Sequence, residues 1–289
     1  MTSTTTDHQA AGPPQVSPDA TRREMTKLSA RGYVTLRNIL VQLPDDQANR
    51  SSTVGWAMNK RKRRELVLYL LLLTCWPWLQ KRDEPLSSDT WLRALKAEGK
   101  TALTWSPSSL SRAWGSLERQ GLVTRTREGQ RMRIEPCRED GKLGDEEGSV
   151  PYTAPVGDDD RLEHYFILPD EFWHEELFAK LTLSGVVMLL IIAKETSQKQ
   201  DAWLALNRMS AWYGVSQPSA QEGIKQLRDL GYLEARDRWV LAPLAPLGST
   251  NRIYYELSHE FSHEARKLRQ TKTRLSREVR LRSVSKRNR

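Results

Sequence analysis

Residues 106–123 read SPSSLSRAWGSLERQGLV and residues 216–233 read SQPSAQEGIKQLRDLGYL, and the two stretches follow one pattern. The serines that open them, Ser106 and Ser216, are 110 residues apart, and so are the glycines Gly121 and Gly231. A serine N-cap, an apolar row at helical spacing and a glycine stop predict a helix of about four turns that leads into a strand. Self-similarity at this spacing predicts two related domains in tandem.

The length and the charge distribution agree with two globular domains plus tails. A chain of 289 residues with 38% hydrophobic residues can build two domains of about 100 residues each. The formal charge is +9, but residues 265–289 alone hold eleven Lys and Arg residues against one acid, Glu278, and so carry +10. A concentrated basic segment is typical of nucleic-acid binding and, less often, of contact with an anionic membrane surface.

Cysteine usage and the N-terminal composition indicate a cytoplasmic protein. Cys75 and Cys137 are far apart and not at a metal-binding spacing, which argues against a disulfide scaffold and against a zinc finger. Residues 1–18 are rich in Thr, Pro and Gln and lack the basic-then-apolar pattern of a signal peptide. We expect a cytoplasmic, nucleoid-associated protein.

One apolar run imitates a membrane anchor. Residues 60–64 (KRKRR) precede residues 66–79, which are apolar except for Thr74. This run is shorter than the ~18–20 residues that span a bilayer. Residues 183–193 (LSGVVMLLIIA) form a comparable run in the second half. Both runs are therefore predicted to be buried helices of domain cores, and no membrane partner is expected.

Composition shifts divide the chain into five segments. These are a disordered arm (1–30), a first domain (31–138), an acidic flexible linker (139–162), a second domain (163–258) and a basic helix or tail (259–289). The linker is assigned because it is rich in Gly, Asp and Glu and lacks apolar periodicity.

The first repeated helix, residues 106–120, has two faces. Its apolar residues Leu110, Ala113, Trp114 and Leu117 recur at the spacing of a core-facing stripe. Small hydroxyl side chains allow close approach to phosphates, and arginine can make a bidentate contact to guanine. The opposite face therefore supplies the DNA-binding candidates Ser108, Ser109, Ser111, Arg112, Ser116 and Arg119.

Residues 123–135 are predicted to form a hairpin about Glu128-Gly-Gln130. Strand alternation is expected to place Arg125, Arg127, Arg131 and Arg133 on one face, and Thr124, Thr126, Met132 and Ile134 on the other. Four arginines on one face of a ribbon repel each other unless a polyanion neutralises them. The hairpin is therefore predicted to contact the DNA backbone.

The second copy differs at the equivalent positions, because Glu222 replaces Arg112 and Gln221 replaces Ser111. A carboxylate can accept from cytosine but more often repels phosphate. The second hairpin also mixes arginines with Glu234 and Asp237. This copy is either a weaker DNA reader or a protein-interaction domain that binds a second copy of the chain or another protein. Its candidate residues are Gln217, Ser219, Gln221, Lys225, Arg236 and Arg238.

The serine-capped helix, its glycine stop and the hairpin that follows resemble the recognition helix and wing of winged helix-turn-helix proteins, over residues 57–136 and 165–257. The resemblance implies a mainly α fold with small β wings, built as two tandem winged-helix domains, and double-stranded DNA as the partner. We expect the protein to be a transcriptional regulator, with the basic tail adding phosphate contacts. The tandem also resembles plasmid or mobile-element replication or partition initiators, and a winged-helix adaptor that binds only protein is the alternative from another class.

One motif points to a different activity. His259-Glu260-Phe-Ser-His263 matches the H-E-x-x-H pattern of zinc peptidases, in which two histidines on one helix bind zinc and the glutamate serves as base. The surrounding residues are basic and polar, whereas a catalytic zinc helix needs apolar surroundings. The match is interpreted as coincidental, so we expect a protein that is not an enzyme and has no metal or other cofactor.

Overall fold

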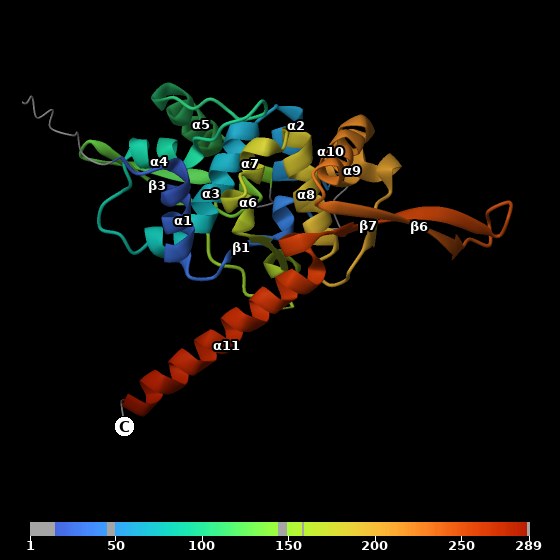
Figure 1. The fold of residues 1–289 in the computed structure, drawn as a ribbon. Coiled ribbons are helices and arrows are strands. Elements are labelled where there is room, and N and C mark those ends of the chain that lie inside the picture. Colours follow the sequence, from blue (N-terminus) through green and yellow to red (C-terminus); the bar gives the residue numbers. More distant parts are fainter. Residues whose placement is uncertain (1–14, 45–49, 144–148, 158, 288–289) are drawn as a thin grey trace, which may run out of the picture.

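The computed structural model describes residues 15–44, 50–143, 149–157 and 159–287, and its fold is mainly α with small antiparallel sheets (Figure 1). The first half contains α1 (Pro18–Ser29), β1 (Tyr33–Arg37), α2 (Thr53–Asn59), α3 (Arg63–Leu79), α4 (Ser88–Leu95), α5 (Pro107–Arg119), β2 (Val123–Glu128) and β3 (Arg131–Pro136). The second half contains β4 (Tyr165–Pro169), α6 (Glu171–His174), α7 (Leu177–Lys180), α8 (Leu183–Glu195), β5 (Ala202–Trp203), α9 (Met209–Tyr213), α10 (Gln217–Asp229), β6 (Leu233–Leu241), β7 (Ser249–Leu257) and α11 (His263–Arg287).

The two repeats occupy matching positions. Each half runs from a buried helix through a short helix and a serine-capped helix into a hairpin, as α3–α4–α5–β2–β3 and α8–α9–α10–β6–β7. The Ser106 and Ser216 hydroxyls accept the backbone N–H of the residue three positions on. Gly121 (φ 77°) and Gly231 (φ 79°) follow the helices in the left-handed region. In the second half, β5 adds a third strand to the hairpin, in the order β5-β7-β6.

The apolar runs form the core, as predicted. Residues 65–75 of α3 and 184–193 of α8 are buried, and side chains of both halves join one continuous hydrophobic core. Within the described part of the chain, no helix is both long enough and apolar enough to cross a bilayer.

The prediction of a disordered arm is wrong for residues 18–29, which form α1. Its Ser17 N-cap and the burial of Met25 and Thr26 explain why this segment is ordered. Arg22 is 2% exposed and bonds to Glu176 and to the Ala94 carbonyl oxygen. Residues 1–14 of the predicted arm lie outside the described residues.

The two halves are interlocked. Strand β1 of the first half pairs antiparallel with β4 of the second, with Tyr33 opposite Pro169. Helix α2 also lies close to the second half, because a Cβ on Gly55 would sit 2.7 Å from the carbonyl oxygen of Tyr213. The predicted boundary therefore separates the repeats in sequence but not in space.

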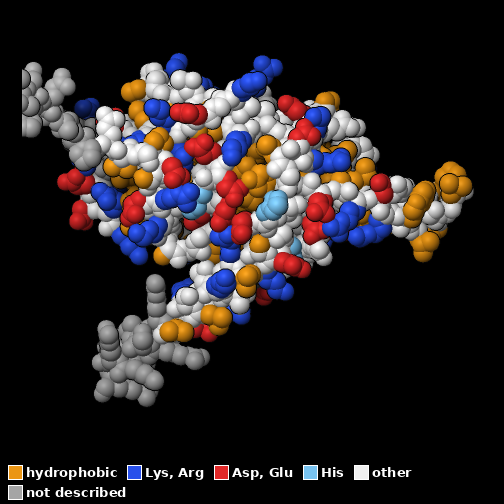
Figure 2. Space-filling view, in the orientation of Figure 1, with side chains coloured by type: hydrophobic (Ala, Val, Ile, Leu, Met, Phe, Trp, Pro, Cys, Tyr) orange, Lys and Arg blue, Asp and Glu red, His pale blue; other side chains and the backbone are white. Residues whose placement is uncertain are grey.

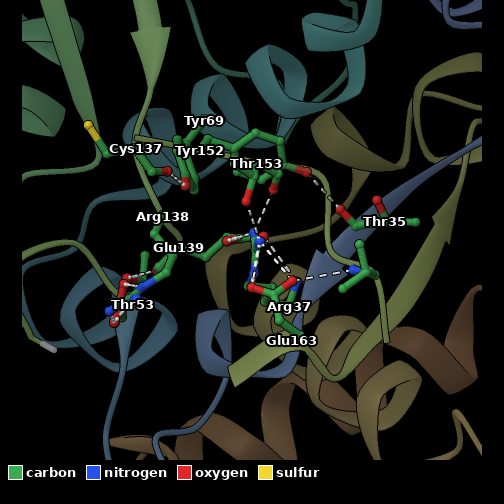
Figure 3. Close-up of polar contacts among 12 residues, drawn as sticks. Thr35, Arg37, Thr53, Tyr69, Cys137, Arg138, Glu139, Tyr152, Thr153 and Glu163 are labelled. Atoms are coloured by element: carbon green, nitrogen blue, oxygen red, sulfur yellow. Dashed lines mark hydrogen bonds and ion pairs between the residues drawn. The ribbon is translucent and has the colours of Figure 1, made fainter. Parts of the chain in front are cut away.

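The flexible-linker prediction is wrong at its N-terminal end, where charged residues are buried in pairs (Figure 3). Arg37, 1% exposed, donates to Glu139 at 3.1 Å, to Glu163 at 3.0 Å and to the Thr153 carbonyl oxygen at 2.7 Å. Arg37 keeps Glu139 paired, although burial raises the pKa of this carboxyl. The acidic residues Glu139 and Glu163 of this segment therefore form ion pairs with Arg37 of β1. Residues 144–148 and 158 of the predicted linker lie outside the described residues.

Candidate nucleic-acid interface

Helix α5 exposes most of its predicted polar face. Its apolar residues are buried as predicted, and Ser108, Ser111, Arg112 and Arg119 are exposed. Ser116 is buried at 6% exposure, so its assignment to the exposed face was wrong. Ser109 is half-buried, and its hydroxyl closes the capping box with the backbone of Ser106. The Ser109 hydroxyl is therefore engaged in the N-terminal cap of α5.

A hollow lies between α5 and the loop that separates α2 from α3. Arg61 (φ 54°) lies in the left-handed region within this loop, and α3 begins after it, at Arg63. The hollow is lined by Lys60, Arg61, Lys62, Arg64, Glu65, Ser109, Ser111, Arg112, Ala113, Gly115, Ser116, Arg119 and Arg125. Sequence reasoning missed the cations of residues 60–64 as site residues, because they resembled the flank of a membrane anchor.

Positive charge in the hollow is only partly balanced. Glu65 accepts from Lys62 at 2.9 Å, and Arg64 donates to the Thr104 carbonyl oxygen at 3.1 Å. Arg125 pairs with Glu118, and the remaining cations of the hollow are Lys60, Arg61, Arg112 and Arg119. Within the described ranges none of these four has a carboxylate at ion-pair distance. Such a concave cluster of cations beside exposed serines favours an anionic ligand.

The prediction that four arginines share one face of the first hairpin is wrong. Arg125 lies opposite Ile134 and Arg127 opposite Met132, whereas Arg133 lies opposite Thr126. Residues directly opposite share a face. Arg125 and Arg127 are therefore on one face, and Arg131 and Arg133 on the other. The cause is the two-residue turn Gly129-Gln130, which pairs odd-numbered with even-numbered residues.

The hairpin arginines are mostly neutralised by the chain itself. Arg125 bonds to Glu118 of α5 at 2.8 Å, and Arg131 bonds to Glu84 at 2.7 Å. Arg133 pairs with Glu128, and this hydrogen bond lowers the pKa of the carboxyl. Arg127 is exposed and donates only to the Gly129 carbonyl oxygen, at 3.2 Å. The hairpin arginines therefore do not need a polyanion to relieve their mutual repulsion. Exposed ion pairs are nevertheless weak enough for an arginine to exchange its carboxylate for a phosphate.

The second copy holds less free charge. Gln217 and Gln221 are exposed and Ser219 is half-buried, while Glu222 accepts from Ser184 at 3.0 Å. The candidate cations are paired: Lys225 with Asp229 at 2.6 Å, Arg236 with Glu234 at 2.7 Å and Arg238 with Asp201 at 2.7 Å. Arg238 also stacks on Tyr254, 4.2 Å from the ring centre.

The basic helix α11 projects from the side of the molecule opposite to α5 and α10 (Figure 1). Its first arginines serve the fold. Arg266 is 3% exposed and donates to the carbonyl oxygens of Ala193 and Thr196 at the end of α8, and burial lowers its pKa to about 10. Arg269 bonds to Glu171 at 2.8 Å.

The H-E-x-x-H residues do not share a helix. His259 (φ 54°) lies in a 3₁₀ turn, Glu260 pairs with Arg269, and His263 opens α11 with Nδ1 3.0 Å from the Thr196 carbonyl oxygen. The spacing that would place two histidines on one helical face is therefore lost. Across the described ranges, no group of three His, Cys, Asp or Glu side chains is placed to hold a metal ion.

No protein-family model, curated protein or solved structure matches the chain.

Proposed function

We propose that this chain is a double-stranded DNA-binding protein built from two tandem winged-helix units, and that it acts as a transcriptional regulator without catalysis. The order α8–β5–α9–α10–β6–β7, with β5 pairing to the last hairpin strand, supports a winged helix in the second half. The first half has the same order without the extra strand. Helices α5 and α10 lie along one edge of the molecule, with α2 between them (Figure 1).

The observation that carries the proposal is the unbalanced positive charge of the hollow. In the proposed complex α5 enters the major groove, where Arg112 reads a base edge and Ser108 and Ser111 allow close approach. Lys60, Arg61 and Arg119 hold the flanking phosphates. On the hairpin, Arg125 and Arg127 share the face that includes the α5 contact, so they are the pair proposed for the backbone.

Arg112→Ala and Glu222→Ala form a matched pair, because they alter equivalent positions of the two repeats. We first select bound fragments from a random and a genomic DNA library, and then titrate each variant by fluorescence anisotropy. We expect Arg112→Ala to cost about 1–3 kcal/mol on the selected site and to relax its sequence preference. Glu222→Ala is expected to leave the preference intact. Loss of specific binding in Glu222→Ala alone would assign base reading to the second unit.

The library selection also separates the alternatives. Fragments from promoters support a regulator, whereas fragments from a replication or partition origin of a mobile element support an initiator. No enrichment at low salt would favour the protein-binding adaptor.

The tail is proposed to add only phosphate contacts, through exposed residues such as Lys272, Arg274 and Arg277. Neutralising these three should weaken all DNA sequences about equally.

A further inference from the structure

A cavity of about 410 Å³ lies where helix α11 joins the body of the protein. Its walls come from residue 38 after β1, from residues 164–167 at β4, from residues 197–198 after α8 and from residues 263–270 at the start of α11. Figure 2 shows histidine side chains, in pale blue, on the face of the body from which α11 projects. Ligand-binding pockets commonly have volumes of ~300–1,000 Å³. The cavity is therefore large enough for a small organic molecule.

The wall of this cavity contains cations but no acid. Arg266 and Lys267 of α11 bring positive charge, and the imidazoles of His164 and His263 add charge when they are protonated. Neither Asp nor Glu is among the lining residues. A concave site with charge of one sign attracts ions of the opposite sign. The cavity therefore favours an anionic ligand.

Arg266 is buried without a counter-ion. It is 3% exposed and donates to the carbonyl oxygens of Ala193 and Thr196, at 2.7 and 3.0 Å. No carboxylate of the described residues lies at ion-pair distance from its guanidinium. Burial lowers its pKa to about 10, and no charge in that part of the chain opposes the shift. Carbonyl oxygens satisfy its hydrogen bonds without neutralising its charge, so an anion in the adjoining cavity would stabilise it.

Several polar side chains of the wall have free hydrogen-bonding groups. His263 uses Nδ1 for the Thr196 carbonyl oxygen, at 3.0 Å, and its Nε2 has no partner among the residues described. Four further lining side chains bond to no protein group within the described ranges, namely Ser197, Gln198, Lys267 and Gln270. Donors from α11 and from the segment after α8 therefore meet at one cavity.

We propose that this cavity binds a small organic phosphate, held between α11 and the body of the protein. The free donors are an ammonium, a hydroxyl and two amides on separate segments, so they approach a ligand from different directions. A phosphate group presents three strong acceptor oxygens, which suits such a set. A planar carboxylate is matched best by a guanidinium, and that of Arg266 is engaged with carbonyl oxygens.

The ligand would strengthen the attachment of α11. Contacts to Lys267 and Gln270 on α11 and to Ser197 after α8 would join the two elements that Arg266 already connects. A ligand that binds only the folded state stabilises it. The cavity shares no residue with the hollow beside α5. Phosphate binding there does not depend on DNA binding, and it is tested without DNA.

Heteronuclear NMR of the full chain with isotope-labelled histidine rings gives a local measurement. Inorganic phosphate and glycerol phosphate, titrated at constant pH and ionic strength, should shift the ring signals of His164 and His263 until binding saturates. His174 does not line the cavity and is the internal reference. Glycerol phosphate should bind at least as tightly as inorganic phosphate, because the cavity has room for its organic part. Uncharged glycerol should leave all the signals unchanged.

Two variants test the position of the site. Gln270→Glu places a carboxylate in the cavity with little change of shape, and should raise the phosphate dissociation constant by about tenfold or more. Lys267→Gln removes one cation and should raise it by about tenfold. Lys272→Gln is the matched control, since it removes the same charge from the same helix outside the cavity wall. Thermal unfolding without ligand verifies that the fold is retained, as expected for half-buried or exposed positions.

Three results would overturn the proposal. The first is a pair of cavity histidine signals that inorganic phosphate leaves unchanged, or that it shifts equally in Gln270→Glu. The second is saturable binding of succinate without binding of either phosphate, which would assign the cavity to carboxylates. The third is displacement of glycerol phosphate by a short DNA duplex that shifts the same histidine signals, which would assign these cations to DNA.

Discussion

Neutralising the three proposed phosphate contacts of the hollow tests whether this surface binds DNA. In the triple variant Lys60→Gln, Arg61→Gln and Arg119→Gln, each lost phosphate contact should remove about 0.9 from the slope of log affinity against log salt, or about 2.7 in total. Between 50 and 200 mM salt the affinity of the native protein should therefore fall about 40-fold more than that of the variant. Arg112 is left in place, so that sequence preference is kept.

The assay is fluorescence anisotropy with a selected DNA duplex over a salt series. The control is Arg23→Gln, Lys27→Gln and Lys199→Gln, which removes the same charge from exposed positions outside the hollow. The control slope should stay near the native one. Equal slopes for the two triple variants would show that net charge, and not the hollow, determines affinity, and would refute the placement of DNA against α5.

Three further predictions concern the fold. Arg37→Met should lower the free energy of unfolding by about 3–5 kcal/mol, because it leaves Glu139 buried without its partner; an unchanged denaturant midpoint would contradict the importance of this ion pair. Burial raises the pKa of Asp170 to about 7 from 3.8. Between about pH 4 and pH 7 the folded state therefore binds a proton that the unfolded state has lost. The free energy of unfolding should fall as pH rises through this range, by at most about 4 kcal/mol. Asp170→Asn should flatten that profile, and a profile identical to the native one would assign the pH dependence to other groups. Leu70→Asp should unfold the protein, since an unpaired buried carboxylate costs several kcal/mol against a total of ~5–15 kcal/mol, and a native circular dichroism spectrum would refute the core position of α3.

Sequence alone predicted the elements whose signals are local. The serine caps and glycine stops placed α5 and α10 to within about one residue, because capping depends on residues a few positions apart. The apolar runs at α3 and α8 identified the cores, because nearly every side chain in them is apolar. These predictions needed no knowledge of tertiary contacts.

The errors arose where distant residues decide the structure. The pairing of β1 with β4 joins Tyr33 to Pro169, and no local pattern specifies that partner. The burial of Arg37 with Glu139 has the same origin, because acidic residues near a Gly-rich segment read as a solvated linker until their partner is known. Helix α1 was missed because its composition is polar, although it packs on α3 and α4, where Trp78 donates to the Met25 carbonyl oxygen and Arg22 donates to that of Ala94.

The hairpin error shows how a single residue changes a functional interpretation. Counting Glu128-Gly-Gln130 as the turn placed all four arginines on one face, whereas the turn is Gly129-Gln130. A shift of one residue moves side chains to the opposite face. The argument from repulsion then lost its basis, and the hollow beside the loop of residues 60–62 supplied the stronger reason to propose an anionic ligand.

The two repeats support a division of labour between the halves. At the surface where a recognition helix is proposed to meet DNA, the first unit has several cations without carboxylate partners within the described ranges, among them Lys60, Arg61, Arg112 and Arg119. In the second unit the cations proposed for DNA are paired with acids, and the end of its hairpin exposes the large apolar side chains of Trp239, Leu241, Leu244 and Leu247. Binding of phosphate needs free positive charge, whereas binding of a second protein surface needs apolar area. The divergence of one pattern into these two surfaces therefore supports the proposal that the first unit reads DNA and the second binds protein.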